Sequence, residues 1–160
     1  MKVLVISDTH KRNDNFFRVL DVVGPIDMLI HCGDIEGSEY TITAKAGCHV
    51  EMVAGNNDFF SELPMEREFG IGKYHIWLTH GHNYYVSMGN EMLKQEARAR
   101  GADIVFYGHT HRPVIDYEDD DVIAINPGSI SYPRQDGHMP SYVLMDIDRF
   151  GEAHFTVRYL

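Results

Sequence analysis

The sequence has little of what marks secreted or membrane proteins. Its only cysteines, Cys32 and Cys48, lack the spacing of a disulfide framework, so we expect both to be reduced and buried. No apolar run approaches the roughly 20 residues of a membrane span, and no signal peptide precedes the first apolar strand. These absences favour a cytoplasmic protein with no membrane partner.

Basic residues are also scarce, because 14 Lys and Arg face 24 Asp and Glu, which gives a formal net charge of -10. Sequence-independent binding of nucleic acid depends on Lys and Arg contacts to phosphate, so we expect no stable nucleic-acid complex. A phosphate substrate is still compatible with this charge, since bound divalent cations would make the local field positive.

The remaining composition is that of an ordinary globular protein, with 44% hydrophobic and 24% charged residues. A chain of 160 residues suits one hydrophobic core. We therefore expect a single domain over residues 1–160.

The first half of the chain alternates strand and helix patterns, which predicts a parallel sheet with right-handed crossovers. The expected elements are strands over Lys2–Ser7, Asp27–His31 and Cys48–Ala54, and helices over Asn13–Val23 and from a Ser38 cap to about Ala46.

The second half is richer in strands. A Gly70-Ile71-Gly72 turn separates strands over Glu66–Phe69 and Tyr74–Thr79, and a strand over Ile104–Tyr107 follows a helix over Ser87–Arg100. In that helix we expect Met88, Met92, Leu93 and Ala97 to face inward. Two hairpins complete the chain: Val114–Tyr117 with Val122–Asn126 around the acidic turn Glu118–Asp121, and Tyr142–Asp146 with Ala153–Tyr159. The class is α/β.

Polar side chains that can bind metals follow five of these strands. They are Asp8 and His10, Asp34, Asn56 with Asn57 and Asp58, His80 and His82, and His109 and His111. Ligands of open α/β sheets bind beyond the carboxyl ends of strands, so these side chains could converge on one rim. We expect the glycines at 33, 55 and 108 to permit tight turns just before them.

Oxygen and nitrogen donors without thiolates suit manganese, iron, nickel or zinc in a catalytic site. Each piece alone is ordinary: Asp-x-His after a strand is commonly a turn and helix cap, and Gly-Asn-Asn-Asp is commonly a turn. Seven donors are too many for one metal with open positions, but they suit two metals sharing a carboxylate. Five such motifs, each after a strand, therefore favour a metal site over the alternative that each motif is an ordinary solvated loop.

The order Asp-x-His, Gly-Asp, Gly-Asn-x-Asp, His-Gly-His, Gly-His-x-His resembles the calcineurin-like metallophosphoesterase superfamily. The run Asn126-Pro127-Gly128-Ser129, followed by Pro133-Arg134, resembles its small prokaryotic phosphodiesterase branch. The resemblance implies a four-layer αββα sandwich of two mixed β-sheets with helices outside.

The resemblance also implies the ligands of two divalent ions, with Mn²⁺ as the expected metal and Ni²⁺, Fe²⁺ or Zn²⁺ as alternatives. Asp8, His10, Asp34 and His111 would hold one ion. Asp34, Asn56, His80 and His109 would hold the other. Asp58 and His82 would orient these ligands, and we expect them to act in catalysis together with Asp34 and Asn56.

The implied activity is that of a phosphodiesterase, in which a hydroxide bridging two metals attacks a phosphate ester in line. Many superfamily members carry a histidine after the ligand asparagine, where it protonates the leaving group, but here the residue is Asn57. We therefore expect modest turnover that is best with good leaving groups.

Two other functions compete with this one. A catalytically inactive scaffold would be similar to the retromer subunit of the same fold, although every ligand position is filled here. A nuclease or cyclic-nucleotide phosphodiesterase would act on small nucleotides. The expected partner is a small phosphate ester, and exposed strand edges also favour a homodimer.

Overall fold

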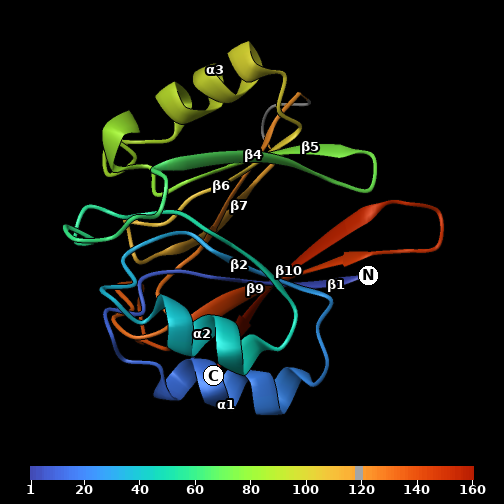
Figure 1. The fold of residues 1–160 in the computed structure, drawn as a ribbon. Helices are drawn as coiled ribbons and strands as arrows, with labels where there is room; N and C mark the ends of the chain where they lie inside the picture. Colours follow the sequence, from blue (N-terminus) through green and yellow to red (C-terminus); the bar gives the residue numbers. More distant parts are fainter. Residues whose placement is uncertain (118–120) are drawn as a thin grey trace.

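Two mixed β-sheets pack face to face in the computed structural model, with helices on their outer faces (Figure 1). The structure describes residues 1–117 and 121–160, so most of the acidic turn expected at Glu118–Asp121 lies outside the described residues. The layers run helix, sheet, sheet, helix. This arrangement confirms the predicted four-layer αββα sandwich.

The first sheet has the strand order β10-β9-β1-β2-β3, in which β1, β2 and β3 are parallel as predicted. Its strands are β1 (Lys2–Ile6), β2 (Met28–His31), β3 (His49–Met52), β9 (Ser141–Ile147) and β10 (Ala153–Tyr159). The crossover helices α1 (Asp14–Val23) and α2 (Glu39–Ala46) cover its outer face.

The second sheet has the order β4-β5-β6-β8-β7, with β5, β6 and β8 parallel to one another. Its strands are β4 (Glu66–Ile71), β5 (Tyr74–Thr79), β6 (Ile104–Phe106), β7 (Pro113–Asp116) and β8 (Ile123–Pro127). A 3-10 turn, η1 (His82–Tyr84), and helix α3 (Glu91–Arg100) connect β5 to β6.

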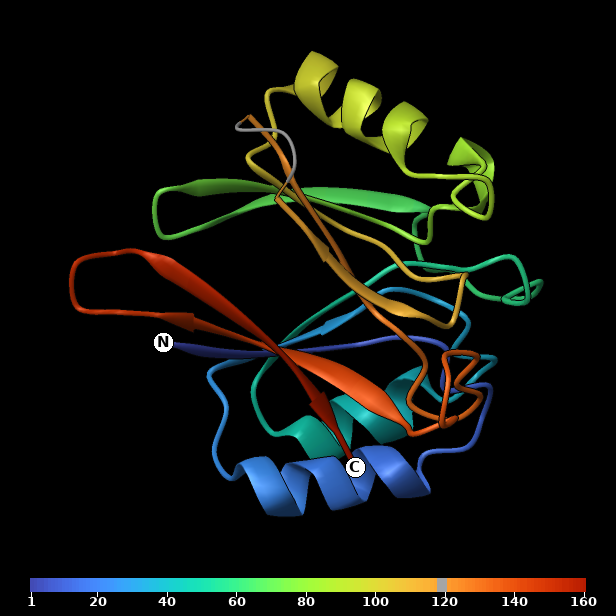
Figure 2. The same ribbon diagram turned by 180° about the vertical axis from the view of Figure 1, so that it is seen from behind.

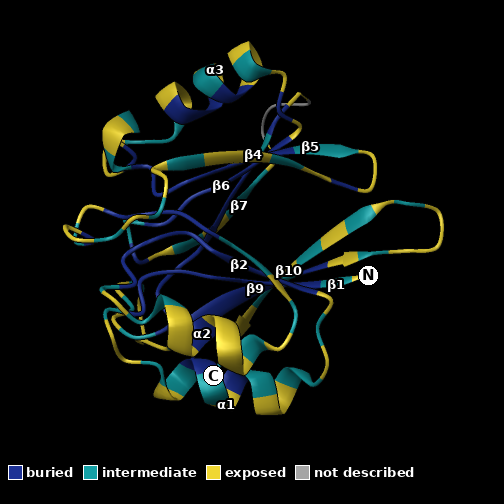
Figure 3. Ribbon diagram, viewed as in Figure 1, coloured by how far each residue is buried: buried dark blue, intermediate teal, exposed yellow. Residues whose placement is uncertain are grey.

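Three apolar clusters separate the four layers. The cluster between the sheets includes Val5 and Leu78, the cluster under α1 and α2 includes Phe16, and the cluster under α3 includes Trp77. The central strands β1, β2 and β6 are therefore buried on both faces, which explains their nearly continuous apolar runs. Figure 3 shows these strands in dark blue between helices whose outer faces are exposed.

The topology places the functional loops together. The loops after β1, β2, β3 and β6 gather on one side of the molecule, whereas the N-terminus and the β9–β10 turn lie on the opposite side (Figures 1 and 2). None of the helices within residues 1–117 and 121–160 combines the length and hydropathy that crossing a membrane requires.

The helix expected over Ser87–Arg100 is shorter than predicted and rotated relative to the prediction. It begins at Glu91, because Gly89 has φ 140°, which an α-helix cannot contain. Leu93 and Ala97 are buried as predicted, but Met88 and Met92 are 89% and 53% exposed. Lys94 is buried instead, with its Nζ 2.9 Å from Asp116 Oδ2.

Two smaller predictions, the turn at Gly70-Ile71-Gly72 and the Ser38 cap, were also wrong. Strand β4 continues to Ile71, whose side chain is buried between the sheets, so the turn lies at Gly72 and Lys73. Strand β8 ends at Pro127, one residue beyond the expected end at Asn126. The Ser38 hydroxyl donates to the carbonyl of Ile35 and does not cap α2.

The rotated face of α3 can be tested with two neighbouring substitutions. Leu93→Ala should lower the free energy of unfolding by about 2–5 kcal/mol, because it leaves a cavity under the helix. Met92→Ala removes a half-exposed side chain and should change stability by about 0.5 kcal/mol or less. Urea unfolding followed by circular dichroism measures both. Equal losses in the two variants would contradict this placement of the helix.

Candidate metal centre

All seven side chains predicted as metal ligands come from loops at the carboxyl ends of strands. Asp8 and His10 follow β1, and Asp34 and Asn56 follow β2 and β3. His80 follows β5 at the facing edge of the second sheet, and His109 and His111 follow β6. Parallel pairing within each sheet sends these strand ends to one edge. The structure therefore brings all seven onto one rim.

One group of donors consists of Asp8, His10, Asp34 and His111, each with a ligand atom within 4.8 Å of the others. His111 Nε2 lies 3.0 Å from Asp8 Oδ1, and His10 Nε2 lies 3.7 Å from Asp34 Oδ2. Asp8 is fully buried and His111 nearly so. This group supplies two carboxylates and two imidazoles to a space the size of one cation.

A second group of donors lies on the other side of Asp34. His80 Nε2 is 3.4 Å from Asp34 Oδ2 and 3.1 Å from Asn56 Oδ1. His109 Nδ1 is 2.9 Å from the same Asn56 oxygen. Asp34 Oδ2 thus faces both groups, which is the position that a bridging carboxylate requires.

Three of the four histidines have their tautomer fixed from outside the centre. The Nδ1–H of His10 donates to Glu36 Oε1 at 2.6 Å, and those of His80 and His111 donate to the carbonyls of Cys32 and Tyr132, each at 2.7 Å. In neutral imidazole the proton then resides on Nδ1, so Nε2 presents a lone pair to the centre.

These tautomers make the first group fit a cation. His10 Nε2 and His111 Nε2 face each other at 3.4 Å, and in the neutral rings neither nitrogen can donate to the other. Both Asp8 carboxylate oxygens are buried without a hydrogen-bond donor among the described residues. Four lone-pair donors without hydrogens suit a divalent ion, and oxygen with nitrogen suits Mn²⁺, Fe²⁺, Ni²⁺ or Zn²⁺.

The centre's own charges shift its pKa values. Burial alone would raise the pKa of Asp8, but the His111 ring, whose Nε2 lies 3.0 Å from Asp8 Oδ1, and the charge of His80 lower it. Burial likewise opposes the lowered pKa of Asp34, which results from His80 and Asn57. Both carboxylates are therefore ionised at neutral pH, as metal ligands must be.

His80 responds in the opposite direction, because its carboxylate neighbours favour the imidazolium. Burial would lower its pKa, but the hydrogen bond to Asp34 and the charge of Asp8 raise it. A cation bound to the same carboxylates would compete with this proton, since metal ligation requires neutral imidazole.

Backbone strain is concentrated at this rim. Asp8, His10, Asp34, His109 and His111 all have φ between 45° and 69°. This left-handed region costs non-glycine residues on the order of 1–3 kcal/mol each and persists only where the surroundings impose it. Positive φ at five of seven candidate ligands marks a functional centre, and the sequence carried no signal for it.

The three glycines expected at tight turns are needed mainly for close packing. Only Gly33 has positive φ, and a Cβ there would lie 2.7 Å from His80 Nδ1. A Cβ at Gly55 would overlap the Asp34 carboxylate, and one at Gly108 would overlap the Ser7 hydroxyl. The glycines thus let the ligand loops touch.

Asp58 holds the ligand loops rather than contacting the ligand side chains. Its carboxylate accepts the backbone N–H groups of Gly55, Ile35 and Glu36 at 2.7, 2.9 and 2.5 Å. It therefore ties the loop that carries Asp34 to the loop that carries Asn56. The sequence suggested an orienting residue here, and the structure provides these contacts.

Asn57 contacts the carboxylate shared by the two groups. Its backbone N–H donates to Asp34 Oδ1 and its Nδ2 to Asp34 Oδ2, each at 2.8 Å. From the sequence, Asn57 was interpreted only as replacing the histidine that protonates the leaving group in many relatives, and its contact with Asp34 was not predicted.

His82 lies beside the second group without a hydrogen bond to a ligand among the described residues. Its ring centroid is 5.4 Å from that of His80 and 6.1 Å from that of His109. Burial and the charge of His80 lower its pKa, so the ring is neutral. No hydrogen bond among the described residues supports the predicted role of His82 in orienting ligands. A role of His82 in catalysis stays a prediction.

Sequence reasoning also missed Glu36, Asn126 and Ser129 as supports of the centre. Glu36 fixes His10, as described above. Asn126 Nδ2 donates to the carbonyl of Gly108 at 2.7 Å, and Ser129 Oγ donates to that of Asp8 at 3.0 Å. The Asn126-Pro127-Gly128-Ser129 run was noticed in the sequence, but not its contacts.

Comparison with known proteins agrees with this geometry. Residues 1–149 match the calcineurin-like phosphoesterase superfamily domain. A probable metallophosphoesterase of Methanocaldococcus jannaschii is 34% identical over 137 residues, which cover 84% of this chain and 70% of that protein. A phosphodiesterase of the same organism is 30% identical over 146 residues, covering 80% and 83% of the two chains.

Solved structures share the fold over nearly the full length. A predicted phosphoesterase of Streptococcus pneumoniae has a TM-score of 0.79 at 27% identity, covering 99% and 97% of the two chains. Vps29 of Entamoeba histolytica complexed with zinc has a TM-score of 0.78 at 25% identity, covering 99% of each. The YfcE phosphoesterase of Escherichia coli, at 22% identity, has a TM-score of 0.68 over 98% of each chain.

The suspected resemblance is thereby confirmed for the superfamily. The family model covers most of the chain, the named relatives include metallophosphoesterases, and the donor set suits divalent metal ions. On this evidence the chain belongs to the calcineurin-like phosphoesterase superfamily.

Proposed function

We propose that the chain is a phosphodiesterase that uses two divalent metal ions, with Mn²⁺ as the expected metal. Asp8, His10, Asp34 and His111 would hold one ion, and Asp34, Asn56, His80 and His109 the other. The observation that carries the proposal is the pair of inward-facing Nε2 atoms of His10 and His111 beside the buried Asp8 carboxylate, for which no described residue provides a hydrogen-bond donor.

The chemistry supplied by such a metal pair is activation of water and neutralisation of charge on the phosphoryl oxygens. The chain's own part is to hold the ligands in place and to receive the ester. A cavity of about 510 Å³ beside His10 and His111 is lined by Tyr132 and Arg134. Arg134 is the cation in this cavity placed to attract a phosphate oxygen.

A protein-binding scaffold is the competing function, because relatives named Vps29 share the fold and one of them was solved with zinc. A metal site is therefore compatible with either function. The two functions are distinguished by the rate at which the protein hydrolyses a small phosphate ester, which is the proposed substrate. A homodimer and a cytoplasmic location belong to the same proposal.

Metal-dependent hydrolysis of bis-p-nitrophenyl phosphate is the first test. With Mn²⁺ the chain should release p-nitrophenolate, and chelation should abolish the release. Asp34→Asn and His109→Ala should each lower kcat/KM by more than about 100-fold, because each removes a proposed ligand. His49→Ala is the control, since this exposed histidine pairs with Glu51 away from the centre. No metal-dependent rate in the parent chain would favour the scaffold.

Asn57 should limit the range of leaving groups. Because an amide cannot protonate an alkoxide, turnover should fall steeply from p-nitrophenyl to methyl esters. Asn57→His should raise the methyl rate relative to the p-nitrophenyl rate by about 10²-fold or more. Using the ratio corrects for the lost contact to Asp34. An unchanged ratio would show that the missing acid does not limit the reaction.

Asp58 should control metal affinity through the backbone. Asp58→Asn places an amide group among three N–H donors, so unfolding free energy should fall by about 1–3 kcal/mol and Mn²⁺ affinity by about 10–100-fold. Urea unfolding and titration calorimetry measure these changes. Asp21→Asn, the same charge change on exposed α1, is the matched control. Unaltered Mn²⁺ affinity in Asp58→Asn would disprove the link between these loops and the metals.

A further inference from the structure

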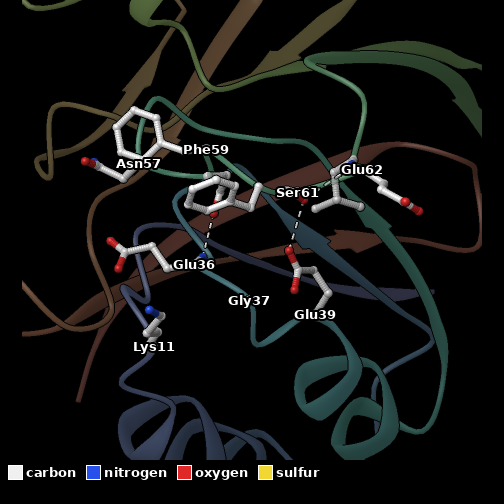
Figure 4. A pocket seen from close by; sticks show the side chains of 11 residues that line it. Lys11, Glu36, Gly37, Glu39, Asn57, Phe59, Ser61 and Glu62 are labelled. Carbon is white, nitrogen blue, oxygen red and sulfur yellow. Dashed lines mark hydrogen bonds between the residues drawn. The ribbon is translucent and has the colours of Figure 1, made fainter.

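A second cavity, of about 710 Å³, adjoins the candidate metal centre and shares Glu36 with the cavity that Arg134 lines. It is formed by the loop after β3, the end of the β2–α2 connection with the first residue of α2, and Lys11 of the loop after β1 (Figure 4). Two of its lining residues also belong to the centre: Glu36 binds His10, and Asn57 binds Asp34. A phosphate ester bound at the metals would therefore direct one of its substituents into this cavity.

Two adjacent aromatic side chains line the cavity without being packed. Phe59 is 80% exposed, and Phe60 is fully exposed. Both follow Asp58, whose three backbone contacts fix the backbone that carries the rings beside the loop of Asp34. Figure 4 shows Asn57 and Phe59 together above Glu36 and Lys11. Two uncovered phenyl rings offer a stacking surface for a planar group.

The charged lining excludes some substituents. Glu36, Glu39 and Glu62 face the cavity, and Lys11 is the one cation in its lining. Asp58 adds a carboxylate already satisfied by backbone N–H groups. A second phosphate or a carboxylate would be repelled here, whereas a neutral ring with amino groups could donate to these acids.

We infer that this cavity binds the base of a nucleoside phosphodiester, stacked on Phe59 and Phe60, while its phosphate lies at the metal centre. The inference rests on the proposed function for the phosphate, but the ring-binding surface is independent of it. The volume agrees, since small-ligand pockets measure about 300–1,000 Å³. Substrates with a polyphosphate or polycarboxylate substituent are excluded from this cavity.

Two cyclic esters with the same strained phosphate ring isolate the effect of the base. Adenosine 2′,3′-cyclic phosphate should be hydrolysed with a lower KM than glycerol 1,2-cyclic phosphate, as measured by phosphorus NMR. Base stacking on aromatic side chains should make the preference about tenfold in kcat/KM. Phe59→Ala and Phe60→Ala should each reduce the preference severalfold and leave the glycerol ester unaffected. Phe150→Ala, at the exposed β9–β10 turn, is the matched control.

A binding measurement separates the inference from the proposed function. Saturation-transfer difference NMR with adenosine and metal-free protein should give ring-proton signals that Phe59→Ala and Phe60→Ala weaken, whereas glycerol should give none. Ring binding without any metal-dependent hydrolysis would support the cavity and reject the proposed function. Hydrolysis of both esters at equal efficiency, with no adenosine signal, would overturn the inference and leave the phosphodiesterase intact.

Discussion

The burial of two carboxylates, Asp8 and Asp34, beside one another is the constraint on which the rest of this structure depends. Uncompensated buried charge costs several kcal/mol per ion, so such a pair persists only with closely placed cations or donors. Here the nearest polar groups are histidines whose Nε2 atoms lie 3.0–3.7 Å from carboxylate oxygens. The same nitrogens carry lone pairs in the neutral rings, so a divalent ion would compensate the pair better than hydrogen bonds can. The two carboxylates therefore favour a bound cation, whose positive charge the described side chains do not supply.

Meeting this constraint requires five loops from two sheets to approach within contact distance, and the contacts that tie them are polar. Asp58 joins the loops after β2 and β3 through backbone N–H groups, and Ser129 ties the segment after β8 to Asp8. The buried ring of His31, whose pKa burial lowers to about 3, accepts the N–H of Gly33 and thus donates from Nε2 to Thr9. The left-handed residues of the rim cost free energy that these fixed loops and the apolar layers beneath them must offset.

Short-range patterns in the sequence predicted the strands and the rim of polar side chains, whereas the four-layer arrangement and the assignment of ligands to two metals came from the family resemblance. Apolar runs identified the buried strands, and donors after five strand ends identified the rim. The sequence did not predict what depends on the fold in three dimensions: the strain at Asp8 and His111, the contact of Glu36 with His10, or the rotation of α3. The α3 error arose because helical periodicity continues through Met88, whereas Gly89 prevents the helix from starting before Glu91.

In the proposed function, substrate specificity would depend on the cavities beside the centre, whereas catalysis would depend on the metal ligands. The donors of the centre could serve any phosphate ester, since they address the phosphoryl group alone. What differs between its two cavities is the lining: Arg134 and Tyr132 in one, and Phe59, Phe60 and two glutamates in the other, while Glu36 lines both. Phe59 and Phe60 follow the ligand asparagine in the sequence by only a few residues, yet their exposure appears only in the structure. Because Asp58 fixes the same short loop, the backbone that carries the two rings is held by the contacts that hold Asn56 in place. In the proposed function, substrate choice and metal binding would thus be coupled through one segment of backbone.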